Sequence, residues 1–513
     1  MLFKFSPLLI FILSLNIYSF VTRYVAKYYA FDEPSSRKIH KSSKSLIGGL
    51  VFSLIFLIIG LINATLPIWF ILGGITTIIL GAVDDNYDLK WYQKLFFQLL
   101  IYLIISFYFF NQINEIIFFN YSFEIGQYAL MSIFLIWFIG IYNSVNLIDG
   151  LDGLAAGIII FLGISISQFQ NVGPSFIELN LILSIILLAY MVYNQRPSKI
   201  FMGDAGSLFL GYFISVLPLL NKDLSLDINS TSLNMTPYLI LAGYLIADTS
   251  RVFFTRLLLG KSPMTADTIH LHHLVIQKSG SYLSTIFIIF LTVCFSCIFS
   301  ILAISNMYSE IGMYIYLFAL FLFILTPPAP TYVSIISKIV KPLYNWDKFK
   351  WATEPKFEKA RTYLILILLL INITLLLINT NNFNHVSIWQ LVLSLLFFIF
   401  YLIFNHKKRR VISAIQLYII LLIMELVSKS EISNILIFFV GITLFSLTVF
   451  TIRRIKGTSI NRFSALDILI FIGTLGIIIL STLGFQINYL LYLAFFSIWF
   501  SLGFIIRRSF SFT

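Results

Sequence analysis

Apolar runs recur along the whole chain of 513 residues, and no other feature restricts the fold as strongly. Each run holds roughly 17 to 22 residues, which is enough for a helix to cross the hydrocarbon core of a bilayer. Hydrophobic residues make up 59% of the chain and charged residues only 11%, whereas soluble domains contain about 25% charged residues. The sequence therefore predicts an all-α polytopic integral membrane protein. Its two cysteines, Cys294 and Cys297, lie inside one apolar run, which argues against a disulfide framework or a zinc site.

About 17 runs are predicted to span the membrane. They cover roughly residues 5–22, 46–62, 66–83, 94–110, 128–145, 154–170, 178–193, 203–220, 237–254, 283–304, 311–328, 362–380, 387–405, 411–428, 433–451, 466–484 and 488–506. Basic residues gather in every second loop, and Lys222 and Lys429 are the clear ones in the opposite set. Because short basic loops stay in the cytoplasm, the N-terminus is predicted outside and the C-terminus inside. The same bias accounts for the net charge of +12, so no nucleic-acid partner is expected.

A long basic connection divides the predicted chain into two parts. Residues 1–330 form an N-terminal unit of about 11 helices, residues 331–361 form the cytoplasmic connection, and residues 362–513 form a second membrane unit of about six helices. The second unit is hydrophobic and contains no acidic cluster comparable to those of the first. A packing module, a lipid-handling unit and an appended anchor all remain open as its role.

Polar residues collect at the end of one predicted span, in residues 143–157. Asn143, Asn146, Asp149 and Asp152 lie there between two apolar runs, together with three glycines. Charged groups are costly in hydrocarbon and usually mark a functional site. The spacing of the first three residues would place them on one face of a last helical turn. The alternative interpretation is a polar cap and turn between two helices, because Asx and Gly are ordinary turn residues.

Three further polar stretches fall on the predicted cytoplasmic side. Residues 84–88 contain Asp84, Asp85 and Asp88, a set of oxygens suited to Mg²⁺ or else a solvated acidic loop. Residues 201–208 open a helix with Gly203 and Asp204, which suits phosphate binding or a simple N-cap. Residues 270–273 hold His270, His272 and His273, three of the six histidines, which suit a metal or an anionic phosphate.

Phosphoryl transfer requires carboxylates, basic groups and a metal ion, because the chemistry depends on positioning the reacting groups and on neutralising the charge of a diphosphate. The chain has no His-Glu-x-x-His motif and no Gly-x-x-x-x-Gly-Lys-Ser/Thr loop, which argues against a zinc hydrolase and against ATP hydrolysis. A transporter or flippase would also suit about 17 spans, but it should place ionisable residues near mid-span. An inactive scaffold is the third alternative.

The four stretches together resemble the polyprenyl-phosphate N-acetylhexosamine-1-phosphate transferases of glycosyltransferase family 4. The matching patterns are Asp-Asp-x-x-Asp (84–88), Asn-x-x-Asn-x-x-Asp-Gly-x-Asp-Gly-Leu-Ala-x-Gly (143–157), Gly-Asp-x-Gly-Ser-x-x-x-Gly (203–211) and His-x-His-His (270–273). The resemblance covers residues 1–330 and includes Arg37, Lys38 and His40 in the first loop. It implies transfer of a sugar phosphate from a UDP-N-acetyl sugar to undecaprenyl phosphate, with release of UMP, as the first step of a cell-envelope polysaccharide.

The resemblance also implies roles for individual residues. It makes Asp204 and Asp84 ligands of Mg²⁺, with Mn²⁺ as an alternative, and Asp85 a candidate base for the lipid phosphate. Which of Asp84 and Asp85 serves as base, nucleophile or metal ligand stays open. The residues implied in substrate binding are Asn143, Asn146, Asp149, Asp152, Asn194, Phe201, His270, His272, His273, Lys38 and Lys44. The expected location is the bacterial inner membrane with the active site on the cytoplasmic face, and a homodimer is one assembly left open.

At two places the chain differs from some members of the family. Asp88 occupies a position where the peptidoglycan branch has lysine, so the chain is more similar to the branch that serves O-antigen and teichoic-acid synthesis. Ala266, Asp267 and Thr268 precede the histidines where many relatives have Pro-Asp-Arg. The missing arginine puts one sugar or diphosphate contact in doubt.

Overall fold

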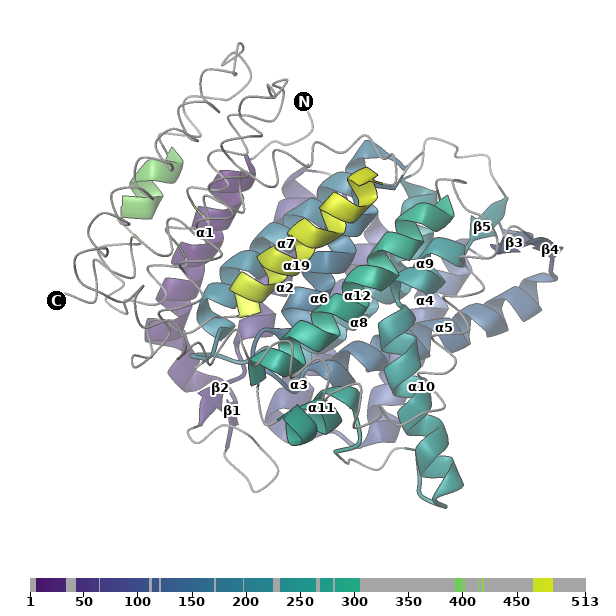
Figure 1. Ribbon diagram of the computed structural model, residues 1–513, viewed down its shortest axis with the longest axis horizontal. Coiled ribbons are helices and arrows are strands. Elements are labelled where there is room, and N and C mark those ends of the chain that lie inside the picture. Colours follow the sequence, from purple (N-terminus) through teal and green to yellow (C-terminus); the bar gives the residue numbers. More distant parts are fainter. Residues whose placement is uncertain are drawn as a thin grey trace, which may run out of the picture. The chain divides into compact units, whose positions relative to one another are not determined.

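The computed structural model, whose helices and strands are labelled in Figure 1, divides into two compact units. The first unit contains residues 1–4 and 20–333, and the second contains residues 5–19 and 334–513. The structure describes residues 6–33, 43–63, 65–109, 113–119, 121–169, 172–196, 198–224, 231–263, 268–279, 282–304, 393–399, 401, 414, 418 and 465–482. The predicted connection at 331–361 and most of the predicted spans after residue 304 lie outside these ranges, so the unit boundaries, the total of 17 spans and the orientation of the termini stay predictions.

The first unit is mostly helical. Its helices are α2 (Gly48–Asn63), α3 (Ile68–Tyr87), α4 (Trp91–Phe109), α5 (Gln127–Ile148), α6 (Leu154–Ile166), α7 (Pro174–Asn194), α8 (Gly203–Asp223), α9 (Thr236–Leu241), α10 (Gly243–Leu258), α11 (Leu271–Ser279) and α12 (Tyr282–Ile304). Within the described ranges of the whole chain, seven helices are long and apolar enough to cross a membrane. The prediction of a polytopic helical membrane protein is therefore confirmed.

The predicted spans correspond to observed helices up to residue 304, with one difference. The span expected at 237–254 is interrupted at Ala242, which ends α9 and precedes α10. Helix α10 then continues to Leu258 and contains Asp248, Arg251 and Arg256 among its buried residues. A helix that buries three charged residues is packed against protein along this face, which a hydropathy pattern does not register.

Short strands make the fold less purely helical than predicted. They are β1 (Phe31–Asp32), β2 (Lys44–Ser45), β3 (Glu115–Phe118), β4 (Tyr121–Glu124) and β5 (Ser232–Asn234). Strands β1 and β2 pair antiparallel, and β3 pairs with β4 antiparallel and with β5 parallel. All five lie in connections between helices, where pairing satisfies the backbone groups of the loops. The expectation of an all-α chain was therefore too strict.

Helix α8 is the central helix of the first unit. Every residue from Ala205 to Leu220 is buried, and α8 packs against α2, α3 and α5. A helix that is apolar and buried on all sides belongs to the core of a bundle. Pro218 lies inside it, as is tolerated in membrane helices whose neighbours satisfy the released carbonyl.

Small residues let the neighbouring helices approach α8 at its N-terminal end. The Cα of Gly206 lies so close to Gly49 of α2 that a Cβ on either residue would collide with the other backbone. Gly81 of α3 makes the same kind of contact with the backbone of Ala205. Because membrane helices associate through close packing of small residues, these contacts hold the ends of α2, α3 and α8 together.

The second unit is described in three places only. Helix α1 (Pro7–Phe20) carries Asn16, whose Nδ2 donates to the carbonyl oxygens of Ile12 at 2.9 Å and Phe397 at 3.0 Å. The rings of Phe398 and Tyr418 stack with centroids 4.0 Å apart. Helix α19 (Ala465–Thr482) contains one charged residue, the buried Asp467 in its first turn.

Replacing Gly206 with valine should separate α2 from α8. The added side chain meets backbone on α2, and overpacking of this kind costs about 1–3 kcal/mol or more. We expect a clear fall in the thermal unfolding temperature of the purified protein. Gly140→Val is the matched control, because Gly140 of α5 is exposed and has open space around its Cα. Equal unfolding temperatures for the two variants would contradict the packing role of Gly206.

Candidate functional site

The polar stretches predicted from the sequence meet at one end of the helix bundle. The backbone N–H of Asp204 donates to Oδ1 of Asp85 at 2.6 Å, which joins the first stretch to the third. The hydroxyl of Ser207 donates to Oδ1 of Asn146 at 3.0 Å, which joins the third stretch to the second. Residues more than 100 positions apart in the chain therefore form one polar cluster.

The histidine stretch joins the same cluster. A Cβ on Gly150 would collide with Nε2 of His272, so this imidazole lies directly against the turn of residues 143–157. The hydroxyl of Tyr282, which follows the histidines, donates to the carbonyl oxygen of Asp152. Contacts therefore link the first stretch to the third, the third to the second and the second to the histidines.

The Asp85 carboxylate caps the N-terminus of α8. Besides the bond from Asp204, its Oδ2 accepts the N–H of Ala205 at 3.3 Å and the hydroxyl of Tyr29 at 3.0 Å. Gly203 has a φ of 68°, and a Cβ there would lie 2.7 Å from Oδ2 of Asp85. Only glycine permits both the left-handed backbone and this approach. The helix terminus that the sequence offers to a phosphate therefore already donates two N–H groups to Asp85.

Two carboxylates from different helices converge on one ammonium group. The Nζ of Lys94 on α4 contacts Oδ2 of Asp84 on α3, and it lies 3.3 Å from Oδ2 of Asp204 on α8. The other oxygen of Asp84 accepts the N–H of Leu89 at 2.8 Å. A single positive centre thus compensates two largely buried acids, which would be costly to bury alone.

No group of three or more His, Cys, Asp or Glu residues in the described ranges is arranged to hold a metal ion. The predicted ligands Asp84 and Asp204 nevertheless contact the same cation, the ammonium of Lys94. Carboxylate oxygens are the donors that Mg²⁺ prefers, and Mg²⁺ commonly takes one or two protein carboxylates with water and phosphate oxygens completing its shell. The pair therefore fits a divalent ion of this kind.

Several predicted substrate amides are bonded to the protein itself. Asn143 and Gln98 exchange two side-chain hydrogen bonds of 3.0 Å between α5 and α4. Asn194 accepts the N–H of Gly153 at 2.7 Å and donates to the carbonyl oxygen of Ile200 at 2.9 Å. With Asn146 bonded to Ser207, these amides connect the elements around the site.

Asp149 and Asp152 lie on the turn after α5. Burial, together with the neighbouring charges of Asp152 and Asp85, raises the pKa of Asp149 to about 7. Burial also raises the pKa of Asp152, while hydrogen bonds from Ser198 and the positive charge of Lys44 act in the opposite direction. Asp149 is consequently poised to change its charge near neutral pH, which is common at functional sites.

The first loop reaches this carboxylate pair through β2. Ser45 forms an isolated bridge with Ile200, and the carbonyl oxygen of Ser45 accepts the N–H of Phe201 at 2.9 Å. This pairing brings Lys44 of β2 next to the backbone before α8 and leaves the ring of Phe201 half-buried. Lys38 lies outside the described residues.

The histidines differ in their surroundings. Nδ1 of His270 lies 3.0 Å from Oδ2 of Asp248. Burial and the adjacent His273 lower the pKa of His272 to about 3, so this imidazole is neutral at physiological pH. The ring of His273 lies 4.2 Å from that of His272, measured between centroids. His272 therefore does not supply the positive charge for an anion that the sequence suggested for this stretch.

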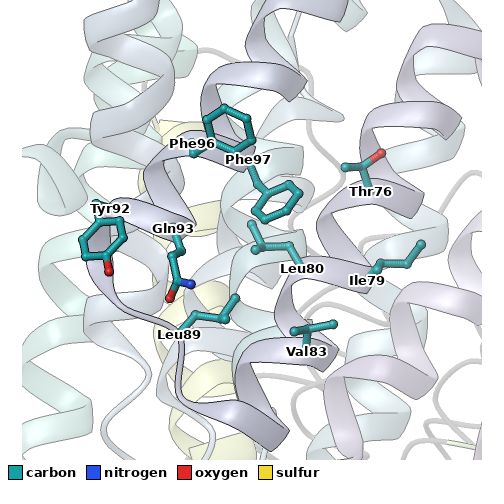
Figure 2. Close-up of a pocket in the computed structure, with 9 residues that line it drawn as sticks. All are labelled: Thr76, Ile79, Leu80, Val83, Leu89, Tyr92, Gln93, Phe96 and Phe97. Atoms are coloured by element: carbon teal, nitrogen blue, oxygen red, sulfur yellow. The ribbon is translucent and has the colours of Figure 1, made fainter.

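An apolar groove lies between α3 and α4 beside the carboxylates (Figure 2). Its volume is about 520 Å³, and Leu80, Phe96 and Phe97 are among its lining residues. The groove reaches Leu89 and Gln93. Leu89 is bonded to Asp84 and Gln93 precedes Lys94, so apolar and charged surfaces adjoin here.

The sequence analysis missed Lys94, Tyr29, Asp248 and Arg251 as members of this cluster. Lys94 lies at the start of an apolar run, and Asp248 and Arg251 lie inside another, so a charge within a span was the available signal. Tyr29 carried no signal, because nothing in its sequence context distinguishes it from the other 26 tyrosines.

Membrane-length helices around a cluster of carboxylates, a bridging lysine and buried histidines define a polytopic membrane protein with a buried polar site. The pattern of glycosyl transferase family 4 matches residues 67–221. The chain belongs to this family, as the resemblance predicted.

Relatives with stated activities support this assignment. A probable undecaprenyl-phosphate N-acetylglucosaminyl 1-phosphate transferase of Bacillus subtilis (strain 168) is 35% identical over 347 residues, which cover 66% of this chain and 91% of the relative. An undecaprenyl-phosphate alpha-N-acetylglucosaminyl 1-phosphate transferase of Thermotoga maritima is 29% identical over 313 residues, or 61% of this chain and 94% of the relative. A phospho-N-acetylmuramoyl-pentapeptide-transferase of Thermotoga petrophila is 32% identical over 191 residues, or 36% of this chain and 62% of the relative.

The Asp149→Asn exchange should alter how stability depends on pH. An unfolded aspartate has a pKa of about 3.9, so between about pH 4 and pH 7 only folded Asp149 keeps its proton and stability falls as pH rises. Asparagine stays neutral and avoids this loss. We expect the unfolding temperature of the variant to exceed that of the wild type by a margin that grows from pH 5 to pH 8. A margin that stays constant over this pH range would contradict the raised pKa of Asp149.

Proposed function

We propose that the protein transfers an N-acetylhexosamine 1-phosphate from a UDP-linked sugar to undecaprenyl phosphate and releases UMP. UDP-N-acetylglucosamine is the first donor to consider, because the Bacillus and Thermotoga maritima relatives are N-acetylglucosaminyl 1-phosphate transferases by name. The reaction would take place at the cytoplasmic face of a bacterial inner membrane and would start a cell-envelope polysaccharide.

The convergence of Asp84 and Asp204 on one cation is the observation that carries this proposal. We propose that these two carboxylates hold Mg²⁺, or Mn²⁺, in the working enzyme. When bound, the ion would neutralise charge on the diphosphate of the donor and on the attacking phosphate. Lys94 has a flexible stem and would then turn its ammonium from the carboxylates to a phosphate oxygen.

The acceptor needs little activation by the protein. A phosphate monoester has a second pKa near 6, so a lipid phosphate is already largely ionised at neutral pH. Asp85 accepts hydrogen bonds from Asp204, Ala205 and Tyr29, which favours a positioning role over proton abstraction. Asp85 would hold the start of α8 so that Asp84 and Asp204 face the same phosphate.

The remaining groups would bind the two substrates. Asp149 and Asp152 would accept hydrogen bonds from the nucleotide, the Phe201 ring would stack on uracil, and Lys44 with Lys38 would contact phosphate. The groove between α3 and α4 would take the first isoprene units of the acceptor, because its lining is apolar and its end adjoins Asp84 (Figure 2). Shape and charge thus support one site for a nucleotide, a diphosphate and a lipid.

UMP release is the test. Purified protein in detergent would receive undecaprenyl phosphate, Mg²⁺ and a panel of UDP-N-acetyl sugars. We expect UMP only when lipid and Mg²⁺ are both present. Asp204→Asn should lower kcat by about 100-fold or more, equivalent to about 3 kcal/mol of transition-state stabilisation.

Asp223→Asn is the matched control, because Asp223 ends the same helix and bonds to Trp69 at 3.0 Å. Wild-type turnover in Asp204→Asn would refute the metal-site assignment. Absence of UMP with every donor, from folded wild-type protein, would shift the proposal to the transporter or scaffold alternatives.

Lys94→Met should make folding depend on a divalent ion. Without the ammonium, Asp84 and Asp204 lack their shared cation, so the unfolding temperature should fall in EDTA. Millimolar Mg²⁺ should then raise the unfolding temperature of the variant by several degrees more than that of the wild type. Lys90→Met changes an exposed lysine on the preceding turn and should respond to Mg²⁺ as the wild type does. No Mg²⁺ response in Lys94→Met would mean that the carboxylate pair binds no divalent ion.

A further inference from the structure

Asp248 lies outside all four polar stretches of the sequence, yet it is a fully buried carboxylate in contact with the histidines. Its side chain on α10 is 0% exposed. Burial of a carboxylate is costly unless donors and a positive charge surround it. Its surroundings therefore indicate what it does for the site.

Three donors converge on Asp248. Its Oδ1 accepts Nη2 of Arg251 at 2.9 Å and the N–H of Leu271 at 2.8 Å, and its Oδ2 lies 3.0 Å from Nδ1 of His270. Nη2 of Arg251 also donates to the carbonyl oxygen of Ile269 at 2.6 Å. One ion pair on α10 thus holds the backbone on both sides of His270 as well as its ring.

This arrangement selects one tautomer of His270. An ionised carboxylate can only accept hydrogen bonds, so the imidazole must carry its proton on Nδ1. In the neutral ring Nε2 is then a hydrogen-bond acceptor. Arg251 pairs with the same carboxylate, so Asp248 has a positively charged partner besides the imidazole.

Three histidine ring nitrogens have no hydrogen-bond partner among the described residues: Nε2 of His270 and both ring nitrogens of His272. All three are buried, and the two residues are 4% and 1% exposed, respectively. The two rings lie nearly parallel with centroids 6.0 Å apart, and His272 abuts Gly150. Buried polar atoms without partners are rare and call for an explanation such as a ligand.

We infer that Asp248 is a positioning residue, which fixes His270 with its proton on Nδ1 and so presents Nε2 as an acceptor to a hydroxyl or amide N–H of the sugar nucleotide. This inference rests on the proposed function for the identity of the ligand. Asp248 itself does not touch substrate and acts through His270, in the way that a carboxylate partner sets the tautomer of a functional histidine.

The Asp248→Asn exchange should invert the tautomer of His270 while preserving the size of the side chain at position 248. The amide oxygen would keep the position that accepts Arg251 and Leu271, so its NH₂ group would face Nδ1 of His270 and force the ring proton to Nε2. Solid-state ¹⁵N NMR of histidine-labelled protein distinguishes protonated from unprotonated ring nitrogens, and a His270→Gln spectrum assigns the signal. We expect Nδ1–H in the wild type and Nε2–H in Asp248→Asn.

Kinetics provide the second readout. The KM for UDP-N-acetylglucosamine should rise about tenfold or more in Asp248→Asn, because an acceptor has become a donor. The KM for undecaprenyl phosphate should stay within about twofold of wild type, since the contact belongs to the other substrate. Glu178→Gln is the control for an isosteric change at a buried carboxylate, because Glu178 bonds to Asn63 in another part of the bundle; it should leave both KM values unchanged.

Either readout can overturn the inference. A wild-type His270 protonated on Nε2, or an unchanged tautomer in Asp248→Asn, would show that Asp248 does not set the ring. An inverted tautomer with an unchanged KM for the sugar nucleotide would show that His270 does not contact it. If the wild type releases no UMP, the proposed function fails, while the NMR result still decides what Asp248 does to His270.

Discussion

The hydrogen bonds from the first N–H groups of α8 to the Asp85 carboxylate are the contact on which the rest of the site depends. The first turn of a helix has N–H groups without partners inside the helix, and leaving them unpaired in a buried place is costly. Asp85 supplies the acceptor from α3, and the contact of Gly81 with Ala205 allows the two backbones to approach. Asp84, the preceding residue, is thereby placed beside Asp204.

Much of the polar sequence around this contact holds the elements of the site together. Asn143, Asn146 and Asn194 each bond to another element of the protein. Such bonds are needed where loops and helix ends are packed away from water, because unsatisfied amides are costly there. The amides are paired in this way, but within the described ranges the negative charges of Asp84 and Asp204 have only one lysine, Lys94, to compensate them both.

Burial also decides the charge state of the site. The pKa of Asp149 rises to about 7 and that of His272 falls to about 3, both because the charged form loses solvation. The cluster is therefore less charged than its sequence suggests. A neutral imidazole such as that of His272 can recognise a partner by hydrogen-bond geometry, whereas a cationic one would act mainly by charge.

The sequence by itself determined the helical membrane fold, the helix positions up to residue 304 and the four stretches that meet, because hydropathy and clustered polar residues are local signals. Only the tertiary structure decided which side chains of the site bond to one another. Lys94 joins Asp84 to Asp204 and Asp85 caps α8, both between residues more than 100 positions apart in the chain, and Asp248 of α10 holds His270 just before α11. Such pairings depend on how close two backbones approach and on which side chains are buried together, and neither quantity is encoded in local residue spacing.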